Sequence, residues 1–297
     1  MDWDRLKIFA TVAEAGSFTM AARRLNLSQS ATSRQIKALE DSLGVPLFTR
    51  HARGLVLTGE GEYLLRTAQD VMARLEAAER SLLDARGAPR GKLVVTTMIS
   101  FGALWLTPHL KEFLHRYPDI ELDLNLSDED LDLARREADV AIRFHAPHQA
   151  DLIQRPFVKV HHHIYAAPSY IARKGVPRSP RDLDRHDIIT YGPTPPPAIK
   201  DINWTLTLGA GEVQRRPVLQ VNNTYAVLRA IEAGIGLAAV PDYIAAHNST
   251  LVRILPEIEG PAFETHFVYP RELKGSKRVA LFRDFLFEQI KGGEKDL

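Results

Sequence analysis

Six side chains that suit the recognition of nucleic-acid bases and phosphates lie between residues 29 and 37. One is an amide, three are hydroxyls and two are cations: Gln29, Ser30, Thr32, Ser33, Arg34 and Lys37. An amide can form two hydrogen bonds with adenine, an arginine can bind guanine or the backbone, and hydroxyls can reach bases or phosphates. This set therefore has the chemistry of DNA recognition, provided that one helix presents it on one face.

The residues before this stretch predict two helices. The first is amphipathic, with apolar residues at steps of three and four, and it would end at Gly16. Ser17 or Thr19 can cap a short second helix over Met20–Leu25. The alanines of this second helix would let another helix cross it closely.

A third helix is expected after a turn at Asn26 and Leu27. Ser28 is a good N-cap for it, and Gly44 would end it. Its expected inward positions are Ala31, Ile36, Leu39 and Leu43. The polar set would then face outward from the amino-terminal end, as in the recognition helix of a helix-turn-helix.

Residues 49–54 predict a short hairpin with a basic tip. They lie between the apolar pair Leu47-Phe48 and the apolar run 55–57, and they include Arg50 and Arg53. Such a wing would contact DNA phosphates. The alternative for residues 1–57 is a three-helix docking module with a polar surface.

Charge is distributed unevenly along the chain. Residues 19–57 contain six bases and two acids, a balance of +4, whereas the whole chain carries +1. The remainder therefore carries 1 − 4 = −3. A small basic module on a mildly acidic body is typical of a nucleic-acid-binding protein.

Residues 9–48, FATVAEAGSFTMAARRLNLSQSATSRQIKALEDSLGVPLF, closely resemble the DNA-binding domain of LysR-type transcriptional regulators. The resemblance implies that Gln29, Ser30, Ser33 and Arg34 contact bases, and that Thr32, Arg50 and Arg53 contact the backbone. We expect Ser28 and Lys37 to join the backbone contacts. Promoter DNA is the implied partner, and RNA polymerase is a further candidate.

A long helix after Thr58 carries a heptad pattern. Its apolar residues recur at steps of 4, 3, 4, 3 and 4: Leu64, Ala68, Val71, Leu75, Ala78 and Leu82. A partner helix would bury this stripe and make a dimer, or a dimer of dimers, which supplies a second half-site. The alternative is a helix packed on its own domain. Residues 86–91 have the glycine and proline content of a hinge.

The remaining residues alternate between strand and helix patterns, as in βαβ units. Strands are expected at 93–98, 120–126 and 139–144, with helices at 104–117 and 131–136. A second set follows a connection at 157–162, with strands at 164–167, 188–191, 204–208, 218–221 and 235–240 and a helix at 224–233. A strand at 264–269 and a helix at 279–290 would return to the first lobe.

The expected fold class is α/β. It comprises a winged helix-turn-helix (1–58), a linker helix and hinge (59–90), and a two-lobed domain like periplasmic binding proteins (91–297). Lobe I would contain 91–160 and 267–297, and lobe II would contain 161–266.

In such sheets, ligands lie beyond the carboxyl ends of strands and near helix amino termini. Together with Tyr191, the residues expected there are Thr97, Ser100, Ser127, Arg143, Asn203, Asn222 and Asn223. The LysR resemblance implies a small effector in this cleft, and Arg143 suggests an anionic or polyhydroxy one. The alternatives are caps for the serines, an ion pair for Arg143 and turns for the asparagines.

Several chemistries are not expected. The chain has no cysteine, and no nucleophile is paired with a base, so we expect neither an enzyme nor a bound cofactor. His161 and His163 could share one side of a strand, but no third ligand is identifiable, so partly exposed imidazoles are expected rather than a metal site.

The amino terminus lacks the features of a signal peptide, and no apolar run approaches the roughly 18 residues of a membrane span. We therefore expect a cytoplasmic regulator without a membrane partner. Alternatives are a regulator that senses no effector, a small-molecule receptor without DNA binding, and an enzyme that uses the cleft.

Overall fold

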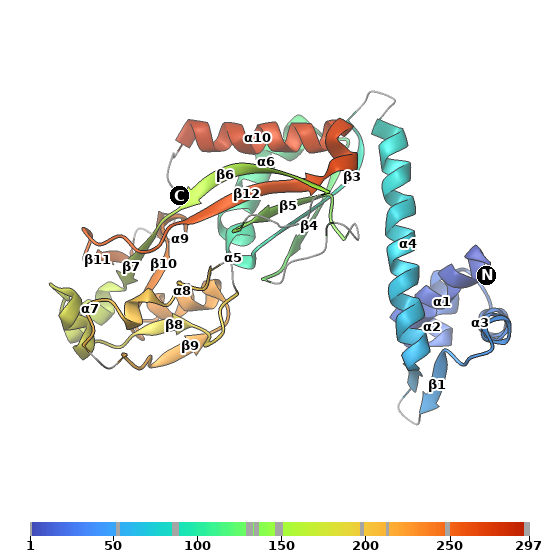
Figure 1. Cartoon of the computed structure of the whole chain (residues 1–297), viewed down its shortest axis with the longest axis horizontal. Coiled ribbons are helices and arrows are strands. Elements are labelled where there is room, and N and C mark those ends of the chain that lie inside the picture. Colours follow the sequence, from blue (N-terminus) through green and yellow to red (C-terminus); the bar gives the residue numbers. More distant parts are fainter. Residues whose placement is uncertain are drawn as a thin grey trace. The chain divides into compact units, whose positions relative to one another are not determined.

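The computed structural model describes residues 2–51, 54–84, 89–128, 133, 137–145, 151–196, 199–211, 214–246 and 250–293 (Figure 1). The chain divides into two compact units, residues 1–79 and 80–297, and each is described by itself. The predicted hinge at 86–91 lies partly outside the described residues. So does the predicted helix at 131–136, apart from Leu133.

The first unit is a helix-turn-helix followed by a hairpin and a long helix. It comprises α1 (Trp3–Ala15), α2 (Phe18–Arg24), α3 (Gln29–Leu43), the antiparallel strands β1 (Phe48–His51) and β2 (Gly54–Leu57), and the start of α4 (Gly59–Asp84). Hydroxyl oxygens of Ser17 and Ser28 accept hydrogen bonds from the first turns of α2 and α3. Gly16 and Gly44 end their helices in the left-handed conformation that glycine adopts without strain.

The three short helices enclose one apolar core. Phe9, Val12, Ala21 and Leu39 are fully buried in it. The small Ala21 side chain allows close contact between α2 and its neighbours. Leu43 was expected to face inward, but its side chain is exposed, so that prediction is wrong.

The start of α4 is fastened to the hairpin. Thr58 Oγ1 accepts a hydrogen bond from Gly61 N (2.9 Å) and donates one to Pro46 O (2.8 Å). A Cβ at Gly61 would lie 2.2 Å from Leu47 O, so only glycine fits this approach. Thr58 therefore caps α4, the long helix expected after it.

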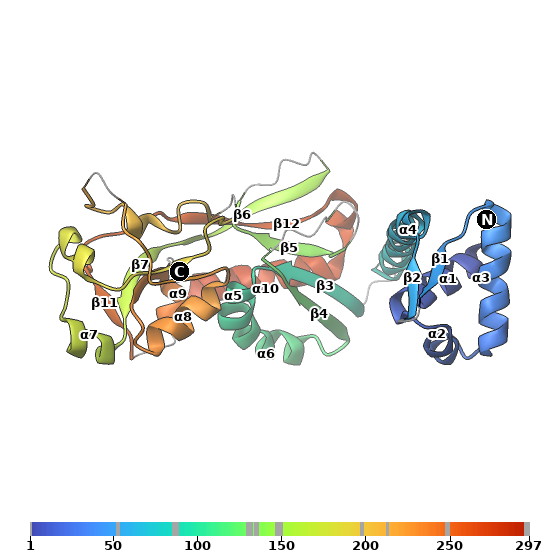
Figure 2. The same ribbon diagram turned by 90° about the horizontal axis from the view of Figure 1, so that it is seen from below.

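Lobe I, as we use the term, is the five-stranded sheet of the second unit with its helices (Figure 2). Its strand order is β4-β3-β5-β12-β6. The strands are β3 (Gly91–Thr97), β4 (Ile120–Leu126), β5 (Val140–Arg143), β6 (Leu152–Val160) and β12 (Phe263–Pro270). β3 is parallel to β4 and β5, whereas β12 is antiparallel to β5 and β6. The buried parallel strand expected at 139–144 is confirmed.

Helices that follow β3 and β12 in the chain belong to the same lobe. α5 (Ile99–Phe101), a π-helical turn (Gly102–Leu106) and α6 (Thr107–Arg116) form one continuous run after β3. α10 (Lys277–Gly293) follows β12. Its inner face carries the buried side chains of Phe282, Phe285 and Leu286. The buried Arg278 donates to Lys92 O (2.6 Å), which joins α10 to β3.

Lobe II contains two small sheets. One has the order β10-β7-β11, built from β10 (Leu237–Pro241), β7 (His162–Ala166) and β11 (Val252–Ile254). The other pairs β8 (Ile189–Tyr191) with β9 (Leu219–Val221). The helices are α7 (Pro168–Lys174), α8 (Thr224–Glu232) and α9 (Asp242–Ala246).

Two local predictions are wrong. The strand expected at 204–208 is a 3-10 turn at Trp204–Leu206, because its apolar side chains pack around a turn that is held by bonds such as Thr207 N to Trp204 O. The connection expected at 157–162 consists mostly of the end of β6 and the start of β7. Along β6, buried Phe157 and Val158 lie next to each other, so the strict alternation that marks a strand is missing.

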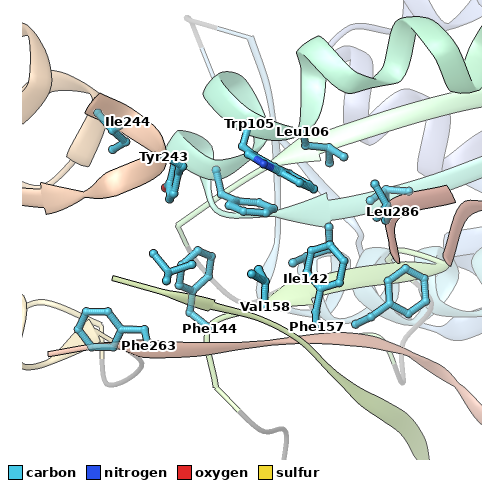
Figure 3. Close-up of a cluster of buried hydrophobic side chains, with 14 of the residues drawn as sticks. Trp105, Leu106, Ile142, Phe144, Phe157, Val158, Tyr243, Ile244, Phe263 and Leu286 are labelled. Atoms are coloured by element: carbon cyan, nitrogen blue, oxygen red, sulfur yellow. The ribbon is translucent and has the colours of Figure 1, made fainter. Parts of the chain in front are cut away.

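One apolar cluster joins the two lobes. Figure 3 shows Tyr243 and Ile244 of α9 facing Trp105 across buried aromatic side chains. Phe101 stacks on Trp105 (ring centroids 4.9 Å apart) and meets Tyr243 edge-on (5.4 Å). The lobes therefore share a core at this point, and polar groups beside it are partly shielded from water.

Candidate DNA-binding surface and small-molecule site

The amino-terminal end of α3 presents most of the predicted recognition residues to solvent. Gln29, Ser30, Arg34 and Lys37 are exposed, and Ser33 is partly exposed. The cap holds this end in shape, because Ser28 Oγ accepts from Ala31 N (3.1 Å) and lies 3.1 Å from Ser30 Oγ. Amide, hydroxyl and cationic groups thus share a helix end that could enter a DNA groove.

Thr32 does not belong to this surface. Its side chain is fully buried, and Oγ1 donates to Ser28 O (3.1 Å). Thr32, Ile36 and Leu39 follow at i, i+4 and i+7, so they share one face of the helix. That face is buried in the core. The prediction that Thr32 contacts the DNA backbone is therefore wrong.

The wing is fixed to α3 by Glu40. Its Oε1 accepts hydrogen bonds from Leu47 N (2.7 Å) and Phe48 N (3.2 Å), at the start of β1. Arg50 lies in β1 opposite Leu55. Arg53 lies outside the described residues. The hairpin itself is confirmed, and its position follows from a carboxylate that sequence analysis had counted only as a negative charge.

The heptad stripe of α4 divides into two parts. Ala68 is fully buried in the core of its own unit, and Leu64 packs against that core. Val71 and Leu75 are exposed to 38% and 47%. The side chains of Ala78 and Leu82 are outside the described part of the chain. The first turns of the stripe therefore hold the helix on its own domain, whereas Val71 and Leu75 are available to a partner.

Three of the predicted effector-site residues lie at or just after the ends of β3 and β4. Thr97 Oγ1 donates to Ile142 O (3.0 Å), and Ser127 N donates to Thr97 O (3.0 Å). Ser100 follows in α5, where its Oγ lies 3.1 Å from the hydroxyl of Tyr243. Lobe I and lobe II thus meet through polar groups as well as through the aromatic cluster.

Asp128 links both lobes at the same place. Its Oδ1 accepts from Ile99 N (3.1 Å), at the start of α5, and its Oδ2 accepts from Asn223 Nδ2 (3.4 Å). The Oδ1 of Asn223 in turn caps α8 by accepting from Ala226 N (3.0 Å). Burial raises the pKa of the Asp128 carboxyl, while these two hydrogen bonds oppose the rise.

The other predicted residues are arranged differently. Asn203 Nδ2 donates to Tyr191 O (3.2 Å) and Gly192 O (3.3 Å), while its Oδ1 is buried without a partner among the described residues. Asn222 lies against Gly192. Asn203 and Asn222 thus lie around the end of β8. Arg143 is almost buried in β5, where the strand register places it opposite His266 of β12.

Two residues of this site, Tyr243 and Asp128, are not among the residues expected from the sequence. Burial raises the pKa of the Tyr243 hydroxyl, and the Asp128 carboxylate raises it further, so the Tyr243 hydroxyl stays neutral. Tyr243 is the second residue of α9, which begins directly after the end of β10. Because ligands lie beyond the carboxyl ends of strands, the end of β10 could have indicated Tyr243 from the sequence.

The histidines at 161–163 have structural partners. His163 Nδ1 lies 2.8 Å from both carboxylate oxygens of Asp242, and His162 packs edge-on against Phe263. Both side chains are buried, so the prediction of partly exposed imidazoles is wrong for them. Within the described ranges, no group of three or more His, Cys, Asp or Glu side chains could hold a metal ion.

No helix in the described part of the chain is both long enough and apolar enough to cross a membrane.

Comparison with known families matches both domains. Residues 3–62 match the bacterial regulatory helix-turn-helix protein, lysR family, and residues 86–291 match the LysR substrate binding domain. The second match alone covers more than half of the chain. The chain therefore belongs to the LysR family of transcriptional regulators, with a DNA-binding helix-turn-helix and an effector-binding domain.

Individual relatives agree with this assignment. An HTH-type transcriptional regulator of Xanthomonas campestris pv. campestris is 32% identical over 95% of this chain and 84% of its own length. The regulator CrgA of Neisseria meningitidis serogroup C is 30% identical over 97% of this chain and 96% of its own.

Solved structures give the same result. The structure of CrgA from Neisseria meningitidis is 28% identical, with a TM-score of 0.61, and the match covers 98% of this chain and 99% of that one. Full-length CbnR complexed with its target DNA is 25% identical, with a TM-score of 0.71, and the match covers 97% and 99%. The predicted family and fold class are confirmed.

Proposed function

We propose that this chain is a cytoplasmic regulator that binds promoter DNA as a dimer or dimer of dimers and changes its DNA complex when a small molecule binds between its lobes. It acts by binding, without catalysis, and RNA polymerase is the downstream partner. Its curated relatives are transcriptional regulators, which supports a role in binding.

The DNA contacts are assigned by position on α3 and the wing. Base contacts come from Gln29, Ser30, Ser33 and Arg34, and phosphate contacts come from Ser28, Lys37, Arg50 and Arg53. The observation that carries this proposal is the capped end of α3 with exposed Gln29, Ser30 and Arg34. Short hydrogen-bonding side chains at such an end can reach base edges in the major groove.

The dimer contact is assigned to α4 beyond its first turns. Val71 and Leu75 are exposed apolar side chains on a regular helix, and Ala78 and Leu82 continue their spacing. Burying this stripe against a second copy would remove apolar surface from water. Two helix-turn-helix units could then occupy two half-sites.

The effector site is assigned to the polar groups where the lobes meet. We assign Thr97, Ser100, Ser127 and Asn223 to it, together with Arg143, Asn203 and Asn222. Two hydrogen bonds cross between the lobes, one between the hydroxyls of Ser100 and Tyr243 and one from Asn223 to Asp128. A ligand that competes for these groups would favour one lobe arrangement, with a coupling of about 1–3 kcal/mol to DNA binding.

The decisive experiment compares specific with scrambled DNA. Mapping the protein on its own genome supplies an operator duplex, and fluorescence anisotropy then measures the Kd of each variant. Gln29→Ala should lower the ratio of specific to scrambled affinity, by an amount equivalent to about 1–3 kcal/mol. Lys37→Ala should weaken both duplexes alike and reduce the salt slope by about one. A uniform loss for Gln29→Ala on every duplex would contradict its role as a base contact.

A further inference from the structure

Asp128 occupies the place that an anionic effector would need. Helix amino termini attract anions because their first N–H groups are free. Here Ile99 N, at the start of the helical run after β3, already donates to Asp128 Oδ1 (3.1 Å). Ala226 N, in the first turn of α8, donates to Asn223 Oδ1 (3.0 Å). One N–H group at each helix start is thus already bonded to a side chain of the same chain.

The negative charge of Asp128 is only partly compensated. A carboxylate has about four acceptor positions. Its two hydrogen-bond donors in the described structure, Ile99 N and Asn223 Nδ2, are neutral, and the second bond is long at 3.4 Å. Burial removes part of the water that would otherwise stabilise the charge. A nearby cation would stabilise such a carboxylate, whereas a second anion would destabilise it.

The neighbouring side chains also suit a cationic ligand. Ser100 and Tyr243 supply hydroxyl oxygens, and burial together with the Asp128 charge raises the pKa of both Tyr191 and Tyr243, which keeps these phenols neutral. Phe101 meets Tyr243 edge-on within the shared core. Aromatic rings beside a carboxylate are a common environment for ammonium and amidinium groups.

We propose that Asp128 selects the effector by charge, and that the effector presents a positively charged nitrogen group, an amine or amidine, to this carboxylate. This inference rests on the proposed effector site between the lobes. It differs from the anionic or polyhydroxy class that Arg143 suggested in the sequence.

The test uses three probes with the same ring and different charge. Benzamidine is cationic, benzamide is neutral and benzoate is anionic. Their binding to the full-length protein is measured by ligand-observed NMR titration, and DNA affinity is measured on the same preparations. Asp128→Asn removes the charge and keeps an acceptor for Ile99 N, whereas Asp128→Glu keeps the charge. Asp123→Asn is the matched control, because it removes one charge from an exposed pair with Lys92.

We expect the wild type, Asp128→Glu and Asp123→Asn to prefer benzamidine over benzoate by about tenfold or more, since like charges in contact are strongly unfavourable. Asp128→Asn should lose most of this preference and bind benzamide nearly unchanged. If Asp128→Asn does not fold, the ranking of the three probes on the wild type and on Asp128→Glu still decides.

The inference is overturned if benzoate binds the wild type most tightly, if none of the probes binds it, or if Asp128→Asn retains the full preference. These results would leave the proposed function standing as long as the protein binds its operator. If the wild type does not bind its operator, the proposed function itself is overturned.

Discussion

The hydroxyl of Tyr243 and the Oγ of Ser100 lie 3.1 Å apart, and both side chains are buried. One belongs to α9 of lobe II and the other to α5 of lobe I. Any motion that separates the lobes here must break this bond or exchange it for one to a ligand. The pair is therefore both a contribution to stability and a contact that an effector could replace.

Tyr243→Phe tests the stabilising part of this role. The substitution keeps the ring that meets Phe101 but removes the hydroxyl, so we expect the free energy of unfolding to fall by about 1–2 kcal/mol. Urea denaturation of the full chain measures the change. Tyr63→Phe, at a strongly exposed ring, is the control and should change stability by less than about 0.5 kcal/mol. Equal effects of both variants would mean that the bond contributes nothing.

Thr32→Val tests whether Thr32 is structural. The buried hydroxyl donates to Ser28 O, so its loss should destabilise the first unit by about 1 kcal/mol. Thr11→Val removes the equivalent bond to Lys7 O in α1 and is the matched control. At a temperature where both variants are folded, anisotropy should give operator affinities within about twofold of the wild type. An equal loss of affinity for specific and scrambled duplexes in Thr32→Val would instead indicate a phosphate contact.

Leu75→Glu tests the assigned dimer contact. Leu75 is exposed on α4, so a charge there should leave the core of its unit intact and destabilise a helix pair that buries the position. Light scattering after size-exclusion chromatography should show a shift towards the monomer. Gln69→Glu, at another exposed position of α4, should leave the assembly unchanged. A monomeric wild type would refute the dimer.

The buried side chain of His162 should make the free energy of unfolding depend on pH. Burial lowers the pKa of His162 to about 3, whereas its ordinary value is 6.5. Between these values the unfolded chain binds a proton that the folded chain does not. The contribution of the neutral His162 to the free energy of unfolding is therefore fully present above pH 6.5. It falls by about 1.4 kcal/mol per pH unit as the pH drops from 6.5 towards 3.

His162→Leu removes this titration. Between about pH 7 and about pH 5, the wild type should lose roughly 2 kcal/mol more of its free energy of unfolding than the variant does. Urea titrations at the two pH values measure the difference. The exposed-histidine variant His115→Gln should follow the wild type. Parallel pH curves for the wild type and His162→Leu would show that His162 is not held neutral.

Local patterns predicted the helix-turn-helix well. Caps at Ser17 and Ser28 and the terminal glycines are short-range signals, and the structure uses each of them. The error at Thr32 came from residue type: a hydroxyl suggests an outward position, but its spacing to Ile36 and Leu39 places it inside. The helical period therefore places Thr32 on the buried face, and its hydroxyl donates to the backbone carbonyl of Ser28.

The effector site was harder to predict, because contacts between distant segments define it. Asp128 meets Asn223, and Ser100 meets Tyr243, only after the lobes pack together. The ends of the predicted strands indicate where such residues lie, but they do not show which donor pairs with which acceptor. The expectation of an anionic or polyhydroxy effector came from Arg143, and the sequence did not show that Asp128 and Asn223 accept hydrogen bonds from the helix starts after β3 and β9.

The place of β12 in lobe I has a consequence for synthesis. This strand lies between β5 and β6 in the sheet, yet it comes late in the chain. A ribosome must therefore release almost the whole polypeptide before the sensor sheet can close, whereas the DNA-reading module emerges first. Because domains tend to fold as they appear, nascent or prematurely terminated copies would carry a finished DNA-reading module without a working sensor.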